Sequence, residues 1–216
     1  MSLSDISYFW EQVLIDTSEA GWVAWIFWGI FLISPLLLSF LTTGFLLNKK
    51  TNKIRSASLK VTVLVSGRNE EQDFPSCIKS LINLDYPKEL LQIILVNDRS
   101  EDSTKDIINR FASENDHVLA LHTEDMPDTH LEAKAWGMKH ASGDWVFITD
   151  ADGEVNSNWL SHSLSVIDEN TGMIGGAIVV EPKGFQGKLE RMTWAYVQMF
   201  NLGMSGWGVP FACVGP

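Results

Sequence analysis

Polar and acidic side chains gather directly after three short apolar segments of this chain. The polar runs that follow these segments are 66–71, 97–102 and 150–154. In open α/β sheets, ligands bind beyond the carboxyl ends of the strands. If the apolar segments are parallel strands of one sheet, the three runs meet at that edge. We therefore interpret them as parts of one site.

The side chains of these runs that could hold a ligand are mostly carboxylates, foremost Asp150 and Asp152. Clustered carboxylates repel one another, so their burial requires either protonation or a bound cation. Oxygen ligands without His or Cys favour Mg²⁺ or Mn²⁺ over zinc or copper. Because magnesium-type ions usually share their coordination with substrate phosphates, the sequence predicts a metal at Asp150 and Asp152 that holds a diphosphate.

The same runs also fit ordinary structural roles. Asp-Ala-Asp-Gly alone is a common polar turn, 97–104 fits a turn with a helix cap, and 69–70 fits a solvated loop. An EF-hand is excluded because Val155 stands where its glycine belongs and Ser161 where its bidentate acid belongs. Phosphate-binding and dinucleotide-binding glycine motifs do not occur in the sequence. The place of each run directly after an apolar segment favours a site.

The elements that must position these runs follow from the alternation of apolar segments with amphipathic stretches. Strands are predicted at 61–65, 92–96, 118–122, 145–149 and 173–180. Helices are predicted at 74–84, 104–114, 131–141 and 158–168. Pro75 fits a first helical turn, and Ser103 with Asp106 has the spacing of a capping box. The alternation predicts an α/β fold with a doubly wound, mainly parallel sheet.

A long uncharged segment precedes this domain. Residues 20–48 carry no charge, and this segment is longer than the about 20 residues that a helix needs to cross a bilayer. Pro35 lies within it, and proline is tolerated in transmembrane helices. Residues 1–19 hold acids but no Lys or Arg, unlike a cleaved signal peptide. The linker 49–60 is basic, so the positive-inside rule places everything after residue 48 in the cytoplasm and residues 1–19 outside it. We expect one transmembrane helix in a cell membrane, with a buried core helix as the alternative.

The composition excludes several classes of protein. The chain has 27 acidic and 16 basic residues and a net charge of −11, which argues against DNA or RNA as a partner. Hydrophobic residues make up 45% of the chain, enough for a folded core. Cys77 and Cys213 lack the spacing of a zinc site, so we expect buried free thiols.

Three motifs resemble those of the inverting, nucleotide-sugar-dependent glycosyltransferases of the family 2 type, which include cellulose, chitin and hyaluronan synthases. The first is a strand followed by Ser66-Gly67-Arg68-Asn69-Glu70. The second, similar to Asp-Asp-Gly-Ser-x-Asp-x-Thr, is Asn97-Asp98-Arg99-Ser100-Glu101-Asp102-Ser103-Thr104. The third is Ala141-Ser142-Gly143-Asp144, a strand, and then Asp150-Ala151-Asp152. Asn97 stands where the family often has an acid, and Arg68 where it often has an aromatic residue.

The resemblance implies a glycosyltransferase-A fold and a donor-binding domain over residues 61–216. Asp98 would bind the base of a nucleotide-sugar donor, Asp150 the ribose or the metal, and Asp152 the Mg²⁺ or Mn²⁺ ion at the diphosphate. The remaining donor-binding residues implied by the resemblance are Ser66, Arg68, Asn69, Glu70 and Lys134. The implied acceptor is a saccharide or lipid hydroxyl, next to the lipid bilayer.

In the family the catalytic base follows the donor-binding half, so the resemblance implies a base beyond Pro216. We therefore expect this chain to bind donor and metal but to transfer no sugar. Two alternatives stay open: a nucleotide-binding membrane module without turnover, and a sugar nucleotidyltransferase. Sugar nucleotidyltransferases have a Gly- and Arg-rich first loop, and this sequence lacks one. An acidic motif downstream of Pro216 would favour the transferase over the binding module.

Overall fold

The structure is a computed structural model, which describes residues 22–47, 59–126, 132–176, 179–182 and 184–209. The chain divides into two units. One unit contains the parallel sheet with its helices, and the other contains two long helices, α2 and α7. Each unit is described by itself.

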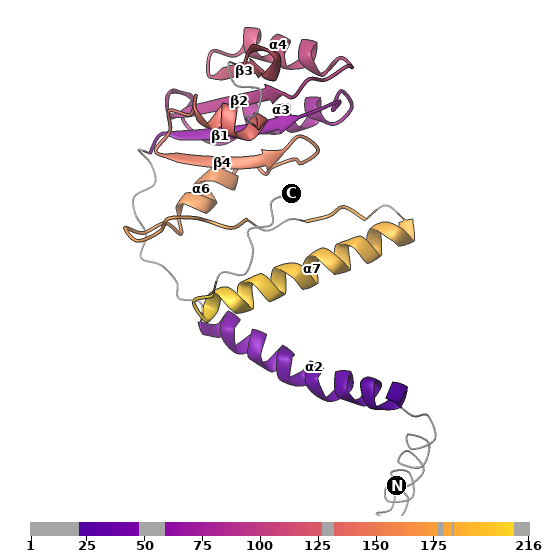
Figure 1. The fold of residues 1–216 in the computed structure, drawn as a ribbon. Helices are drawn as coiled ribbons and strands as arrows, with labels where there is room; N and C mark the ends of the chain where they lie inside the picture. Colours follow the sequence, from indigo (N-terminus) through magenta and orange to yellow (C-terminus); the bar gives the residue numbers. More distant parts are fainter. Residues whose placement is uncertain (1–21, 48–58, 127–131, 177–178, 183, 210–216) are drawn as a thin grey trace, which may run out of the picture. The chain divides into compact units, whose positions relative to one another are not determined.

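Four parallel strands form the sheet, in the order β3-β2-β1-β4 (Figure 1). Their bounds are Val61–Gly67 for β1, Leu91–Asn97 for β2, Val118–His122 for β3 and Trp145–Asp150 for β4. In the register, Gly67 pairs with Asn97, and Ser66 pairs with Asp150. The carboxyl ends of these strands therefore line up at one edge, as the sequence predicts.

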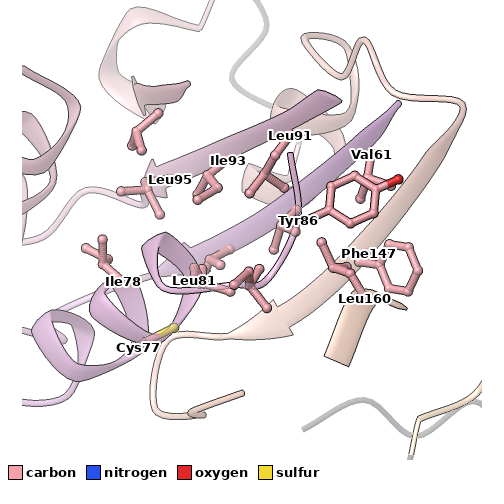
Figure 2. Close-up of a cluster of buried hydrophobic side chains, with 14 of the residues drawn as sticks. Val61, Cys77, Ile78, Leu81, Tyr86, Leu91, Ile93, Leu95, Phe147 and Leu160 are labelled. Carbon is pink, nitrogen blue, oxygen red and sulfur yellow. The ribbon is translucent and has the colours of Figure 1, made fainter. Parts of the chain in front are cut away.

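Helices cover both faces of the sheet. Their bounds are Phe74–Ile82 for α3, Thr104–Glu114 for α4, Ala133–Met138 for α5 and Trp159–Leu164 for α6, with short 3-10 turns η2 (Lys88–Leu90) and η3 (Thr123–Asp125). Figure 2 shows side chains of β1, β2 and β4 packed against those of α3 and α6. Because side chains alternate along a strand, Leu64 and Ile94 face the other side, where Ala133 of α5 packs. The doubly wound parallel sheet is confirmed.

The strand order reverses between β1 and β4. The connections through α3 and α4 carry the chain from β1 to β2 and β3, and the connection through α5 returns it to the far side of β1. Such a reversal separates the two connections on opposite faces and opens a crevice for a ligand at the carboxyl ends of the two strands. Asp150 ends β4 and Ser66 lies beside it in β1, so the predicted site lies at this reversal.

Two local predictions are wrong. The described residues of 173–180 form no strand, and Met173 and Val179 are 65% and 74% exposed, so the apolar run is not buried in the sheet. The Ser103 side chain does not cap α4. Asp102 takes that place, because its Oδ1 accepts a hydrogen bond of 3.0 Å from the Thr104 N–H. Pro75 lies in the first turn of α3, as predicted.

The second unit contains α2 (Trp22–Leu47) and α7 (Gly184–Gly206). The helices meet at glycines, since a Cβ atom on Gly206 would lie 1.6 Å from Gly44 O. The Trp207 ring stacks on Phe40, and its Nε1–H donates to Phe40 O at 3.1 Å. The sequence does not predict α7, because its four glycines argue against a long helix.

A helix forms within the uncharged segment 20–48 and continues through Pro35. Among the residues that the structure describes, however, no helix is long and apolar enough to cross a membrane. The helix is thus confirmed, and the membrane span is not. Residues 1–19, most of the linker 49–60 and Cys213 lie outside the described residues.

Candidate functional site

The first two polar runs are joined by hydrogen bonds beyond the ends of β1 and β2. The Asn69 N–H donates to Ser100 Oγ at 3.0 Å, and Asn69 Oδ1 accepts from the Glu101 N–H at 2.8 Å. Asn69 has a φ of 59°, a left-handed conformation that Asn tolerates better than most residues. The Glu70 N–H donates to Thr104 Oγ1 at 2.8 Å. These contacts fix the backbone around Glu70.

Asp102 connects the same two runs through its carboxylate. Besides capping Thr104, it accepts a hydrogen bond from the Glu71 N–H through Oδ2 at 3.1 Å. Desolvation raises the pKa of Asp102, but the hydrogen bonds from Thr104 and Glu71 together outweigh this effect. The pKa therefore lies below its ordinary value. Asp102 therefore stays ionised and serves to hold the two loops together.

Asp98 follows β2 and has two partners on one oxygen. Arg99 Nη2 lies 2.9 Å from Asp98 Oδ1, and the Thr123 hydroxyl donates to the same oxygen at 3.1 Å. Arg99 reaches this position with a φ of 54°, which is unfavourable for a long side chain. The contacts orient the Asp98 carboxylate and keep Oδ1 occupied.

Asp150 forms an ion pair with Lys134 of α5, the helix on the face of the sheet opposite to α3 and α6. Lys134 Nζ on α5 lies 2.8 Å from Asp150 Oδ1. The close packing of α5 makes this contact feasible, because a Cβ on Gly137 would lie 2.3 Å from Leu64 Cδ1. On the other face, the Cys77 thiol contacts Asp150 O at 3.6 Å. Asp150 is therefore held by contacts from both sides of the sheet.

Several carboxylates lie close enough at this edge to affect each other's ionisation. Burial raises the pKa of Glu70, and Asp152, Asp73, Asp102 and Asp150 raise it further, in that order. The leading charge effect of Asp152 shows that the first and third polar runs lie close together. Burial with the charges of Asp152, Glu154 and Asp150 also raises the pKa of the Cys77 thiol to about 12. Within the described residues, no three His, Cys, Asp or Glu side chains are grouped closely enough to hold a metal ion by themselves.

The predicted site residues thus meet at one edge, with one qualification. The residues gathered there are Ser66, Asn69, Glu70, Asp98, Lys134, Asp150 and Asp152. Arg68 is exposed, and its Nη2 lies 3.7 Å from Glu101 Oε1, so it faces the loop after β2. The sequence interpretation missed Arg99 and Thr123 as partners of Asp98. The place of Thr123 directly after the third strand is the signal that could have identified it.

The third motif begins with a structural contact at the opposite edge of the sheet. Thr62 is fully buried, and its hydroxyl accepts the Gly143 N–H at 2.9 Å and donates to Gln92 Oε1 at 2.8 Å. Asp144 accepts the Lys60 N–H through Oδ2 at 2.9 Å. These contacts attach the loop before β4 to β1 and β2. Gly143 and Asp144 therefore align β4 and do not contact the candidate site.

Comparison with known proteins agrees with this geometry. Residues 62–215 match the family model described as Glycosyl transferase family 2. The chain is similar to the probable glycosyltransferase YdaM of Bacillus subtilis (strain 168), 37% identical over 95 residues, which are 43% of this chain and 23% of that protein. It is also similar to the glycosyltransferase AglE of Haloferax volcanii, 28% identical over 120 residues, which are 55% of this chain and 39% of that protein. This chain thus spans less than half the length of either relative.

Among solved structures, the mannosyltransferase PcManGT from Pyrobaculum calidifontis, in complex with GDP-Man and Mn²⁺, is similar with a TM-score of 0.51. The two are 20% identical, over 74% of this chain and 48% of that chain, which shows a common fold. The parallel α/β sheet is consistent with the glycosyltransferase-A fold. With its sheet, its acidic edge and a match that covers residues 62–215, the chain belongs to glycosyl transferase family 2.

Proposed function

We propose that the acidic edge binds a nucleotide-sugar donor and that the whole protein transfers the sugar, with inversion, to an acceptor hydroxyl. The observation that carries the proposal is that Glu70, Asp98 and Asp150 lie at the carboxyl ends of three neighbouring strands, β1, β2 and β4, next to the point where the strand order reverses. Crevices of this kind bind nucleotides in open α/β sheets. Membership of glycosyl transferase family 2 supports the same conclusion.

The contacts of Asp98 support its role in binding the base. Its Oδ1 is engaged by Arg99 and Thr123, which orients the carboxylate and leaves Oδ2 to accept an N–H from the nucleobase. We assign Ser66, Arg68, Asn69 and Glu70 to the wall of the nucleotide pocket. The Asn69 and Glu70 N–H groups donate hydrogen bonds to Ser100 and Thr104, and these bonds hold this wall in one conformation before the donor arrives.

The donor set fits a divalent ion such as Mg²⁺ or Mn²⁺. Asp150 and Asp152 offer hard carboxylate oxygens, and ions of this type complete their coordination with water and substrate phosphates. Burial raises the pKa of Glu70, and the charges of Asp152 and Asp150 raise it further; a cation would relieve this second, electrostatic part. When bound, the ion supplies Lewis-acid stabilisation of the departing nucleoside diphosphate. Asp150 and Asp152 would hold it, and Lys134 would add a positive charge beside the diphosphate.

We also propose a membrane anchor and a cytoplasmic donor site. The support is in the sequence: residues 20–48 have no charge, and five basic residues lie between 49 and 60. A site beside the bilayer suits an acceptor that is a lipid or a growing saccharide.

Calorimetry of this chain with a panel of nucleoside diphosphates tests the proposal. We expect one base to be preferred and binding to require Mn²⁺ or Mg²⁺, because the acidic edge otherwise repels the phosphates. Equal binding in EDTA would remove the metal from the proposal. Failure of every nucleoside diphosphate to bind in the presence of metal would refute the donor site itself.

A further inference from the structure

The Asp150 carboxylate already has a cationic partner within the chain. Lys134 Nζ lies 2.8 Å from Asp150 Oδ1, and the Asp150 side chain is only 29% exposed. Asp152, the second carboxylate assigned to the metal, is exposed and forms no ion pair with any residue in the described part of the chain. The two carboxylates are therefore unequal, since one of them is neutralised by a lysine.

Lys134 is brought to Asp150 by the packing of its helix. Ala133 and Gly137 lie one turn apart on α5, and both are buried. The lack of a side chain at Gly137 lets the helix lie directly on Leu64 and Val96 of the sheet. The backbone of α5 is thus fixed, while the Lys134 side chain is 47% exposed and has a long, flexible stem. The Lys134 side chain can therefore change its conformation while the backbone of α5 stays in place.

An ammonium group and a divalent ion repel each other when they approach the same oxygen. The repulsion between two like charges is strong at short distances near a protein surface, and a divalent ion doubles it. A metal at Asp150 Oδ1 therefore competes with Lys134. The displaced ammonium carries three hydrogen-bond donors and needs a new acceptor. A diphosphate held by the same metal offers one within reach of the side chain.

We infer that Lys134 exchanges partners during donor binding. Its ammonium leaves Asp150 and donates hydrogen bonds to the donor's diphosphate, and Asp150 becomes available to the metal. The inference rests on the proposed function and adds a property to it: metal and diphosphate bind cooperatively. Metal alone must displace Lys134 without giving it a new partner, whereas metal with diphosphate supplies that partner.

The test measures Mn²⁺ binding to the 216-residue chain by electron paramagnetic resonance, with and without the nucleoside diphosphate that binds best. In Lys134→Met, we expect Mn²⁺ alone to bind roughly two- to fivefold tighter, as expected from loss of a partly exposed ion pair. The nucleoside diphosphate should bind roughly tenfold more weakly in the presence of Mn²⁺, because a charged hydrogen bond is lost. Lys134→Arg should restore both affinities, and Lys134→Gln is a second neutral variant in case Lys134→Met does not fold.

Lys139→Met is the matched control, because it makes the same change in net charge directly after α5. It should alter neither affinity. The exchange is refuted if Mn²⁺ alone binds no tighter to the two neutral Lys134 variants than to Lys139→Met. If the wild-type chain binds no nucleoside diphosphate with Mn²⁺, the proposed function fails and the exchange fails with it. If the wild type binds the diphosphate but Lys134→Met does not shift the affinities for Mn²⁺ and for the diphosphate in opposite directions, the exchange is refuted and the proposed function stands.

Discussion

The substitution Thr62→Val tests how the sheet is held in register below the site. Thr62 is fully buried in β1, and its hydroxyl is the acceptor for the Gly143 N–H at 2.9 Å. Gln92 Oε1 loses one donor but keeps the Ser142 N–H at 2.9 Å, so most of the cost falls on Gly143. Valine has the same shape as threonine and leaves that N–H without its acceptor.

The expected loss of stability is about 2 kcal/mol. An unsatisfied donor costs up to about 3 kcal/mol, and the added methyl group offsets about 0.8 kcal/mol. For a chain of this size, the loss lowers the Tm by roughly 4–8 °C. Thermal unfolding followed by tryptophan fluorescence measures the shift directly.

Thr149→Val is the matched control. Thr149 is also a buried strand threonine, but its hydroxyl makes no hydrogen bond to any residue that the structure describes. Its replacement should therefore leave the Tm unchanged or raise it slightly. Equal Tm values for the two variants would show that solvent satisfies the Gly143 N–H and that Thr62 does not hold the loop before β4.

Three further predictions follow from charge and burial. The folded-state pKa of Glu70 lies above the unfolded value of about 4.3, so its ionised form destabilises the fold at neutral pH and this cost disappears as the pH falls toward about 4. Glu70→Gln should raise the Tm at neutral pH and lose this advantage in acid; a pH-independent effect would contradict the charge argument. Because Cys77 is buried with a pKa of about 12, peptide mapping should find it alkylated only after denaturation. In intact cells, an impermeant thiol reagent should label a cysteine introduced at Ser4 and not one at Ser58, and the reverse pattern would invert the proposed topology.

The sequence is sufficient to predict those parts of the fold that depend on local periodicity. The bounds of α4 are as predicted, and the first four strands lie where apolar runs end at polar residues. Prediction fails where burial depends on the rest of the structure. The run 173–180 has the composition of a strand, but Met173 is exposed. In α7, apolar residues recur at helical spacing while its glycines argue against a helix, and contact with α2 at Gly206 explains why glycine is present there.

In the candidate site, too, the sequence predicts local features but not the contacts that depend on the rest of the fold. The carboxylates Asp98, Asp150 and Asp152 are identified from the sequence because each follows an apolar strand. Their partners are not, since Lys134 approaches Asp150 from a helix on the opposite face. That contact depends on how closely α5 packs on the sheet, which spacing along the chain does not determine. Thr123 reaches Asp98 from the turn η3, directly after the neighbouring strand β3, for a similar reason.

The most direct test of the donor site is calorimetric titration of Asp152→Asn with the preferred nucleoside diphosphate and Mn²⁺. The substitution removes one charge and little volume. Asp116→Asn, near the amino end of β3 at the opposite edge of the sheet, is the control. Metal coordination stabilises phosphate charge by several kcal/mol, so we expect affinity for the diphosphate to fall at least about tenfold in Asp152→Asn and to stay at the wild-type value in Asp116→Asn. Wild-type affinity in Asp152→Asn would contradict the assignment of the acidic edge as the metal and diphosphate site.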